Sequence, residues 1–589
     1  MMSHEKLEIR KKKADPHAGR SALGSPTPGP QQIIYWGALI VIAVGFGLRL
    51  YQLADESLWY DELLQLDIAQ GMPPGQGGIA TILPRLRGHA AVPLDYLISY
   101  FWIFLGRSDG WTRLPAVIAG TLTLPLVYQL GRRLLGPLEG LLLLALLAVS
   151  PLHIRFSQEV RPYALVILGA TLAIYAFWRL RQTGRWRDLL LLQGGVLIFS
   201  LAHFFAWTIF APLILFTAAD FISKPRRKQG AKMVGLLLAT LILPVIILLL
   251  SGWGGLFYTV KGFGEALFEP EKFTATPEQK LDKGQGPLVN DAFVKFEVLA
   301  PLGGGASDAS LWLFNLLAGL GFIYLLARGR YQLGLFLLLW LILPIVIIVI
   351  FLVYRGAFFA ARYIIFILPA YLSLLAVGLL ALPRWLRCAE PRWLSLATFL
   401  ILSGFVLANF SGSLEQLYFT KSKENWRLVG DFIAQNAGPT DKVIAMRAEP
   451  AVNWYYPRAW AAPNYFWTLD EIRETVAEAE RSWVILSIFS SPVDAPVEAW
   501  LTEQGAVAFE LDPIITVYYL GLDTVPDQLL AEAQKFALPV NHSMYASLGS
   551  QNRSRPSVAR QYYQLAIEHA PTDELRAEYQ AALNALAQK

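Results

Sequence analysis

The chain has 589 residues, of which 55% are hydrophobic and 16% are charged, and its mean hydropathy is +0.42. Soluble domains carry charge on about a quarter of their residues, so this composition excludes a soluble protein. The net charge of +5 is no sign of nucleic-acid binding in such an apolar chain. The single cysteine, Cys388, excludes internal disulfides and CxxC metal sites.

The N-terminal residues 1–32 are basic and contain Pro, Gly and Ser, which predicts a disordered cytoplasmic tail. The first apolar run follows at 33–53. It is too long for a signal-peptide core and lacks a small-residue cleavage site, so we expect an uncleaved membrane helix. About eleven transmembrane helices are predicted, because apolar runs of that kind lie at 33–53, 114–130, 137–153, 163–179, 189–201, 204–220, 233–251, 309–327, 333–353, 363–382 and 393–410.

Five short loops rich in Arg and Lys indicate the orientation of these helices. They lie at 132–133, 179–187, 224–232, 328–330 and 384–392, and they alternate with less basic loops. Basic loops mark the cytoplasmic side, so the acids after the first helix are predicted to face the extracytoplasmic side of the plasma (inner) membrane.

This alternation requires that the segment 89–106 does not cross the bilayer. The segment contains Pro93 and Asp95 and is marginal for a span, whereas its aromatic residues suit the headgroup level. We therefore expect an interfacial or re-entrant helix there. A crossing would need one further helix to restore the parity of the later loops.

After about residue 410 the composition becomes that of a soluble domain. Residues 411–522 predict an extracytoplasmic α/β domain with helices at 426–435, 469–480 and 497–504 and strands at 442–446, 483–488 and within 506–520. Residues 523–589 predict a helical tail. Its segment 559–570 resembles one tetratricopeptide unit, although an ordinary helical hairpin explains the pattern equally well.

Two adjacent acids, Asp61 and Glu62, directly follow the first apolar run. Carboxylates at the mouth of a membrane helix are costly near lipid, so we interpret them as functional rather than as a hydrated helix cap. Arginines on the same face suit the stabilisation of a departing phosphate, while an acid can take the proton of an attacking hydroxyl. The outer face is predicted to hold His89, Glu159, Arg161, Tyr163, His203, Arg362 and Tyr363 beside the two acids.

Each candidate also has a simpler structural interpretation. Arg161 and Arg362 could be interfacial arginines whose charged ends reach water. For Glu159 we prefer an ion pair with Arg161, and His203 is more often a hydrogen-bonded histidine at a helix end than a ligand. The outer segment 252–308 predicts a lid or an acceptor-binding loop. No metal-binding spacing such as HExxH supports a divalent cation at the acids, so we make no cofactor prediction.

Several motifs together resemble those of the family 39 glycosyltransferases, which include protein O-mannosyltransferases and bacterial aminoarabinose transferases. They are SLWYDE at 57–62, RLPA at 113–116, SQEVRPYAL at 157–165, ARY at 361–363 and LPA at 368–370. The resemblance covers residues 33–410 and implies an all-α GT-C membrane domain there. The relatives usually carry HGPL or HPPL where this chain reads HAAVPLDY from His89, which leaves the role of this histidine open.

The resemblance implies transfer of a sugar from a polyprenyl-phosphate donor to an acceptor hydroxyl of a protein, lipid or polysaccharide. Asp61 then corresponds to the catalytic base, with Glu62 beside it, and Arg161 and Arg362 lie where donor-phosphate contacts are expected. Tyr163 belongs to the same phosphate-binding motif. His89, Glu159, His203 and Tyr363 are candidates for substrate binding.

Other functions fit parts of the pattern. A polysaccharide ligase or polymerase also uses polyprenyl-linked sugars, but depends on arginines of a large outer loop rather than on an acidic pair. A transporter would place ionisable residues mid-membrane in broken helices and often has two related halves, and neither is evident in the sequence. A non-catalytic scaffold would recruit partners through residues 411–589.

Overall fold

The structure is a computed structural model of the full chain. It describes residues 29–70, 78–88, 92–222, 227–250, 293–303, 308–355, 359–386, 392–420, 423–446, 448–456, 467–487, 495–512, 515–521 and most of 560–587. Residues 1–28 of the predicted tail, His89, and residues 252–292 and 304–307 of the predicted lid lie outside the described residues.

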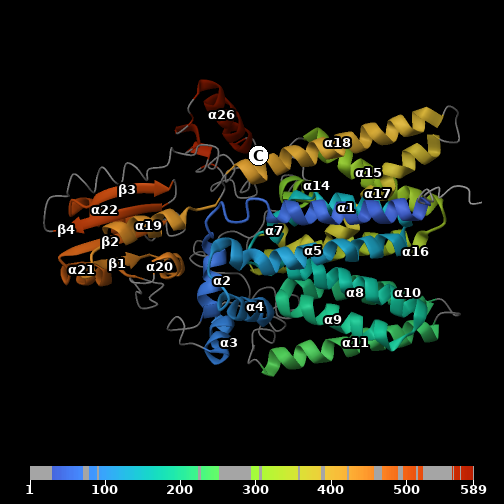
Figure 1. Cartoon of the computed structure of the whole chain (residues 1–589), viewed down its shortest axis with the longest axis horizontal. Helices are drawn as coiled ribbons and strands as arrows, with labels where there is room; N and C mark the ends of the chain where they lie inside the picture. The colour runs from blue at the N-terminus through green and yellow to red at the C-terminus, as the bar shows by residue number, and fades with distance from the viewer. Residues whose placement is uncertain are drawn as a thin grey trace, which may run out of the picture.

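The larger part of the molecule is a bundle of long helices (Figure 1). Its helices are α1 (Pro30–Leu50), α5 (Asp109–Leu134), α6 (Pro137–Ala148), α7 (Pro151–Ser157), α8 (Tyr163–Thr183), α9 (Trp186–Ala202), η1 (Phe204–Ile209), α10 (Phe210–Ile222), α11 (Arg227–Leu250), η4 (Phe293–Leu299), α14 (Ala300–Gly303), α15 (Asp308–Ala327), α16 (Tyr331–Arg355), η5 (Ala361–Ile367), α17 (Leu368–Leu386) and α18 (Arg392–Phe419).

Within the described residues, eight helices are long and apolar enough to cross a membrane, or nine if the bent pair α6 and α7 counts as one span. The predicted number was about eleven. The other two predicted runs, 189–201 and 204–220, coincide with α9 and with η1 and α10, which are apolar but shorter than the rest. The polytopic helical class is therefore confirmed.

The predicted run 137–153 is one stretch in sequence but two helices in the structure. The helices α6 and α7 meet at an angle of 58°. Pro151 begins α7 and cannot donate the backbone hydrogen bond that would continue α6. Arg49 of α1 is buried at the break, where its guanidinium donates to the carbonyls of Leu147 and Ala148 at 3.3 and 3.2 Å. The bend directs the chain after α7 toward the start of α2.

Three short helices lie at the end of the bundle: α2 (Tyr60–Gln70), α3 (Ile79–Gly88) and α4 (Pro93–Ile103). The 11 residues of α4 extend about 16 Å at 1.5 Å per residue, against a hydrocarbon core of about 30 Å. This helix is therefore too short to span, as predicted. Asp95 and Ser99 of α4 are buried and face Gln65 of α2.

The basic loops gather at the opposite end of the bundle. Arg384 forms a 2.6 Å ion pair with Glu139, which joins the end of α17 to the start of α6. Arg330 donates to the carbonyl of Leu135 at 3.2 Å, and the Arg133 side chain donates to Gln182 at 3.0 Å. These contacts bring four of the five predicted basic regions to one end, as the predicted alternation requires.

Helix α17 lies at the centre of the bundle, and the most apolar part of η5 and α17 is completely buried. It packs closely on α15 through two glycines. A Cβ added to Gly378 would lie 1.8 Å from the carbonyl oxygen of Leu317, and one added to Gly321 would lie 2.0 Å from that of Leu374. Only glycine permits the two backbones to approach so closely.

The part of the chain between residues 423 and 521 forms a second unit, which we call the sheet module. It contains α19 (Trp426–Asn436), β1 (Lys442–Ala445), α20 (Glu449–Tyr455), α21 (Leu469–Ala477), β2 (Arg481–Ser487), α22 (Ala495–Glu503), β3 (Val507–Asp512) and β4 (Ile515–Gly521). The strand order is β1-β2-β4-β3, with β1 parallel to β2 and the other pairs antiparallel. The helices and strands expected in this region overlap α19, α21, α22 and β1 to β4 in sequence; α20 was not predicted.

The sheet module sits against the end of the bundle that carries α2 (Figure 1). Leu58, Leu63 and Leu66 of the membrane part share one hydrophobic cluster with Trp426 and Trp454 of the module. Burial of that surface fixes the module on α2. The last helix, α26 (Asp573–Ala587), contributes Tyr579 to the same cluster, while much of the tetratricopeptide-like segment lies outside the described residues.

Candidate active site

The predicted acidic pair lies in the first turn of α2, at the end of the bundle covered by the sheet module. Adjacent residues of a helix point in different directions. The Asp61 side chain is 26% exposed, whereas that of Glu62 is 0% exposed. Asp61 therefore faces an accessible space and Glu62 faces the protein interior.

Asp61 contacts two arginines that come from distant parts of the chain. Its carboxylate lies 3.6 Å from the guanidinium of Arg362 at the start of η5. It lies 3.8 Å from that of Arg161, which also donates to the Asp61 carbonyl at 3.2 Å. The structure thus brings together the acid and the two arginines that the sequence singled out. Burial alone would lower the pKa of Arg161, but interactions led by that with Asp61 raise it well above its usual value. This guanidinium therefore stays charged.

Aromatic rings surround the two arginines. Arg161 lies 5.8 Å from the ring centre of Tyr163, and Arg362 lies 5.6 Å from that of Tyr363 and 5.7 Å from that of Trp59. Such cation–π contacts help to orient the two guanidinium groups.

His203, which lies between α9 and η1, also belongs to this group of aromatic rings. Its ring lies 5.5 Å from that of Tyr163 and stacks at 5.8 Å on that of Tyr363. Burial, followed by the charges of Arg161 and Arg362, lowers the pKa of His203 to about 3, so the ring is neutral. Its Nδ1 accepts from the backbone N–H of Phe205 at 3.2 Å, which assigns the proton to Nε2. The neutral His203 ring is suited to donate a hydrogen bond from Nε2 to a sugar hydroxyl. It is not suited to act as a general acid.

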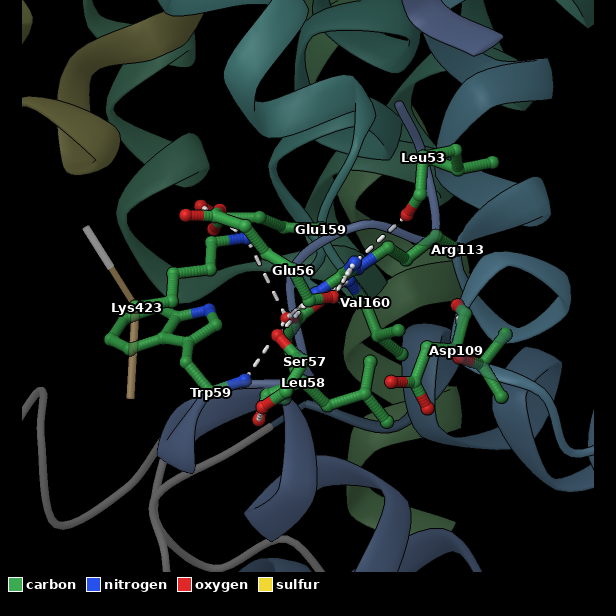
Figure 2. Close-up of polar contacts among 12 residues, drawn as sticks. Leu53, Glu56, Ser57, Leu58, Trp59, Asp109, Arg113, Glu159, Val160 and Lys423 are labelled. Atoms are coloured by element: carbon green, nitrogen blue, oxygen red, sulfur yellow. Dashed lines mark hydrogen bonds and ion pairs between the residues drawn. The ribbon is translucent and has the colours of Figure 1, made fainter. Parts of the chain in front are cut away.

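Glu62 is held by a dense set of bonds. Burial alone would raise the pKa of Glu62, but Arg113 and Lys423, with the backbone N–H of Val160, lower it to about 2. Arg113 binds both carboxylate oxygens at 2.7 and 2.9 Å, and Val160 donates at 2.7 Å. Figure 2 shows Arg113 on one side of this cluster and Lys423 on the other. The Glu62 carboxylate joins α2 to α5 and to the turn before α8.

Glu159 does not form the predicted ion pair with Arg161. It is buried, and its carboxylate lies 3.3 Å from Arg155 and 3.6 Å from Lys423 (Figure 2). The tight turn here, in which the N–H of Arg161 donates to the Glu159 carbonyl at 2.8 Å, separates the two side chains. Glu159 thus lies with Glu62 in the interior and Arg161 with Asp61 at the open side.

Asp95 of α4 is a buried acid near Arg161 that the sequence did not single out as a site residue. Burial raises the pKa of Asp95 to about 6, although the Gln65 amide and Arg161 oppose the shift. Its neighbour Tyr96 also interacts with Arg161 and Asp61. The only signal in the sequence was an acid within a marginally apolar segment.

Three further residues were missed: Arg113, Lys423 and Glu424. Arg113 belongs to a motif that supported the family resemblance but had received no role. Lys423 and Glu424 follow the last membrane helix, where a short charged segment reads as an ordinary linker. Glu424 is buried, and the Lys423 side chain is 10% exposed. The carboxyl group of Glu424 accepts from the N–H of Tyr60 at 3.3 Å. The predicted topology, which placed this segment on the side of Asp61, was the signal that could have found them.

An apolar cavity of about 530 Å³ opens within the bundle between η4, α14, α15, α16 and α17. Asn315 and Tyr371 are its polar lining residues. Phe293 of its wall contacts Phe359 at 5.0 Å between ring centres, and Phe359 in turn lies 6.5 Å from Tyr363. A short series of ring contacts therefore connects the wall of the cavity with Tyr363 beside Arg362.

Comparison with solved structures identifies the architecture. The apo structure of ArnT from Cupriavidus metallidurans has a TM-score of 0.53 at 12% identity, over 83% of this chain and 98% of that one. This chain has the GT-C fold. The structure of the same ArnT bound to undecaprenyl phosphate gives a TM-score of 0.52 with the same identity and coverage.

An archaeal protein of the GT-C fold is also similar. The Archaeoglobus fulgidus oligosaccharyltransferase, tethered to an acceptor peptide through a disulfide, has a TM-score of 0.50 at 12% identity, over 78% of this chain and 69% of that one. A family model described as dolichyl-phosphate-mannose-protein mannosyltransferase matches residues 90–250. No curated protein matches in sequence. The resemblance to GT-C glycosyltransferases drawn from the motifs is thus confirmed.

The described residues contain no group of three His, Cys, Asp or Glu side chains that could hold a metal ion. The acids nearest Asp61 are tied to other groups: Glu62 binds Arg113, and Asp95 accepts from Gln65. Among the described residues, the cations in contact with Asp61 are Arg161 and Arg362.

Proposed function

We propose that this GT-C protein is an integral-membrane glycosyltransferase. It transfers a sugar from a polyprenyl-phosphate donor to an acceptor hydroxyl, with Asp61 as general base and Arg161 and Arg362 as the donor-phosphate site. One observation carries the proposal: the half-buried Asp61 carboxylate faces two arginines from distant parts of the chain, at 3.6 and 3.8 Å.

The reaction that fits this layout is one displacement at the anomeric carbon. Asp61 accepts the proton of the acceptor hydroxyl as its oxygen bonds to the anomeric carbon. The bond from that carbon to the phosphate oxygen breaks, and the leaving lipid phosphate takes the electron pair. Arg161 and Arg362 compensate the added negative charge. One displacement implies inversion of configuration.

The apolar cavity supports a lipid-linked donor. A polyprenyl chain requires an apolar path inside the membrane, and its phosphate requires cations at the membrane surface. The cavity and the two arginines supply both and are joined by Phe293, Phe359 and Tyr363. That a similar ArnT structure holds undecaprenyl phosphate agrees with this assignment.

The ion pairs of Asp61 indicate an order of binding. The Asp61 carboxylate is held in ion pairs with both arginines. A donor phosphate would compete for the same guanidinium groups. We therefore expect the donor to bind first and to release the Asp61 carboxylate from these ion pairs before the acceptor reacts.

We assign the other candidates by their surroundings. The buried Glu62 holds Asp61 in place and does not touch substrate, and the buried Glu159 supports the turn that carries Arg161. Tyr163 orients Arg161, and His203 and Tyr363 line the space for the sugar. We place the site on the extracytoplasmic face, because the basic loops lie at the other end of the bundle.

The test is a transfer assay with purified protein, radiolabelled polyprenyl-phosphate sugars and a membrane extract that supplies acceptors. Wild type should label a recoverable product, and Asp61→Asn should reduce the rate about a hundredfold or more. Asp55→Asn is the matched control, because Asp55 is an exposed acid in the loop before α2.

Full activity of Asp61→Asn would contradict the proposal and favour a ligase or polymerase that uses the same donors. Label that crosses the membrane without covalent transfer would favour a transporter.

A further inference from the structure

We infer that the sheet module is a positioning part of the proposed active site: Lys423, Glu424 and Tyr455 hold the segment that carries Asp61. This inference deepens the proposed function and rests on it for the role of that segment. We call residues 57–62 the Asp61 segment.

Three groups of the Asp61 segment donate hydrogen bonds to the module. The N–H of Leu58 donates to the Tyr455 hydroxyl at 2.9 Å, and the N–H of Tyr60 donates to the Glu424 carboxylate at 3.3 Å. The Ser57 hydroxyl donates to the Glu424 carbonyl at 2.8 Å. N–H groups before and within the first turn of a helix have no acceptor inside the helix. The module therefore supplies acceptors for the N–H groups of Leu58 and Tyr60.

Tyr455 also anchors the module to the membrane bundle. Its hydroxyl donates to Asp109 at 2.8 Å, and Arg427 binds the same carboxylate at 2.5 Å. Arg427 further donates to the carbonyl of Ala54 at 2.9 Å. Asp109 begins the membrane helix α5, so the module bonds to both the loop before α2 and the bundle beneath it.

Lys423 lies between the segment that carries Asp61 and the turn that carries Arg161. Its ammonium group lies 3.7 Å from Glu62 and 3.6 Å from Glu159. Glu62 neighbours Asp61, and Glu159 precedes Arg161 by two residues. The Lys423 side chain is only 10% exposed and lies beside Glu159 in Figure 2. Lys423 is thus shared by two buried carboxylates and ties the two segments together, in addition to the arginines that each acid binds separately, Arg113 at Glu62 and Arg155 at Glu159.

Together these contacts give the sheet module a role in the proposed active site: it holds the Asp61 segment in place. Productive transfer needs the base and the phosphate site held within a fraction of an ångström. The Asp61 segment comprises the last loop residues before α2 and the first turn of α2, so its position depends on the groups bound to it. In this chain, many of those groups belong to the module.

The first test needs no sugar transfer. Hydrogen exchange of the full-length protein in detergent measures the protection of the Leu58 and Tyr60 amides. Tyr455→Phe removes one hydroxyl and should speed exchange at Leu58 about fivefold. Tyr518→Phe is the matched control, because the Tyr518 hydroxyl binds Glu498 within the module, away from α2. Equal protection of Leu58 in wild type and Tyr455→Phe would overturn the inference.

The second test compares steady-state transfer by Lys423→Met, Lys423→Arg and the exposed-lysine control Lys442→Met. Lys423→Met should lower kcat between about tenfold and a hundredfold while the donor KM stays within about twofold, and Lys423→Arg should recover most of the loss. A folded Lys423→Met protein with wild-type kcat would overturn the positioning role.

The two proposals fail in different ways. If wild type transfers no sugar while the Asp61 segment still loses protection in Tyr455→Phe, the proposed function fails and the structural attachment stands. If wild type is active and neither variant changes exchange or kcat, the positioning inference alone is wrong.

Discussion

At the scale of single residues, the two adjacent acids Asp61 and Glu62 point in different directions, because consecutive residues of an α-helix are about 100° apart around its axis. Asp61 keeps 26% of its side chain exposed, and Glu62 has none. The sequence could predict that the pair matters, since carboxylates at a membrane surface are costly. It could not separate them, because the partner of Glu62 is Arg113, fifty-one residues away in sequence.

The arginines give the first residue-scale prediction. Arg161→Gln and Arg362→Gln should each lower kcat/KM about 10²- to 10³-fold, because one guanidinium is lost from the leaving phosphate. Both should raise the donor KM, whereas Asp61→Asn should not raise it, because this change removes a carboxylate that competes with the donor phosphate for the two guanidinium groups. Initial rates over a range of donor concentrations test this, with the exposed Arg473→Gln as control. An unchanged donor KM in both arginine variants would contradict the phosphate assignment.

Glu424 gives a prediction about pH. Burial, together with the neighbouring charges of Asp512 and Asp61, raises the pKa of Glu424 to about 8, although its backbone hydrogen bonds oppose the shift. A carboxyl group with a higher pKa in the folded than in the unfolded state makes its whole contribution to the free energy of unfolding below about pH 4.5, where it is protonated in both states. That contribution is lost as the pH rises through about 8, by up to about 1.4 kcal/mol per pH unit.

Glu424→Gln cannot ionise, so its melting temperature should fall less than that of wild type between pH 5 and pH 9, each value being measured in the same detergent. Parallel loss in the two proteins would show that Glu424 does not titrate in this range.

At the scale of helices and strands, most of the architecture follows from hydrophobic periodicity. The apolar runs coincide with helices, and the alternating strands of the module fall where the sequence predicts them. The break between α6 and α7 was not predicted, because the run 137–153 is apolar throughout. Its cause is Pro151, together with Arg49, whose guanidinium binds the carbonyls at the end of α6.

The contact between α15 and α17 gives a prediction at this scale. Gly378→Ala should destabilise the protein by about 1–3 kcal/mol, because its Cβ would meet the Leu317 carbonyl at 1.8 Å and a backbone group cannot rotate away. Gly404→Ala on α18 is the control, since nothing lies within 4 Å of an added Cβ there. Thermal unfolding in detergent should show a lower midpoint for Gly378→Ala only; equal midpoints would mean that the helices are not packed so closely.

At the scale of the whole molecule, the arrangement has two ends with different chemistry. Basic loops meet at one end, and the acid, its arginines and the sheet module meet at the other. The sequence predicted this polarity from loop composition alone. It could not predict that the module contributes Lys423 and Glu424 to the site, since contacts across more than 360 residues depend on how the two units dock.

The orientation can be tested in intact cells. In a Cys388→Ala background, a cysteine at exposed Asp55 should react with a membrane-impermeant maleimide, and one at exposed Gln182 should react only after permeabilisation. The reverse pattern would place Asp61 on the cytoplasmic side and contradict the proposed site.

The central claim is that Asp61 takes the proton of the acceptor. The most direct measurement is the single-turnover rate of sugar transfer by Asp61→Asn at saturating donor and acceptor. We predict a rate about a hundredfold or more below that of wild type. A rate equal to that of wild type would contradict the account.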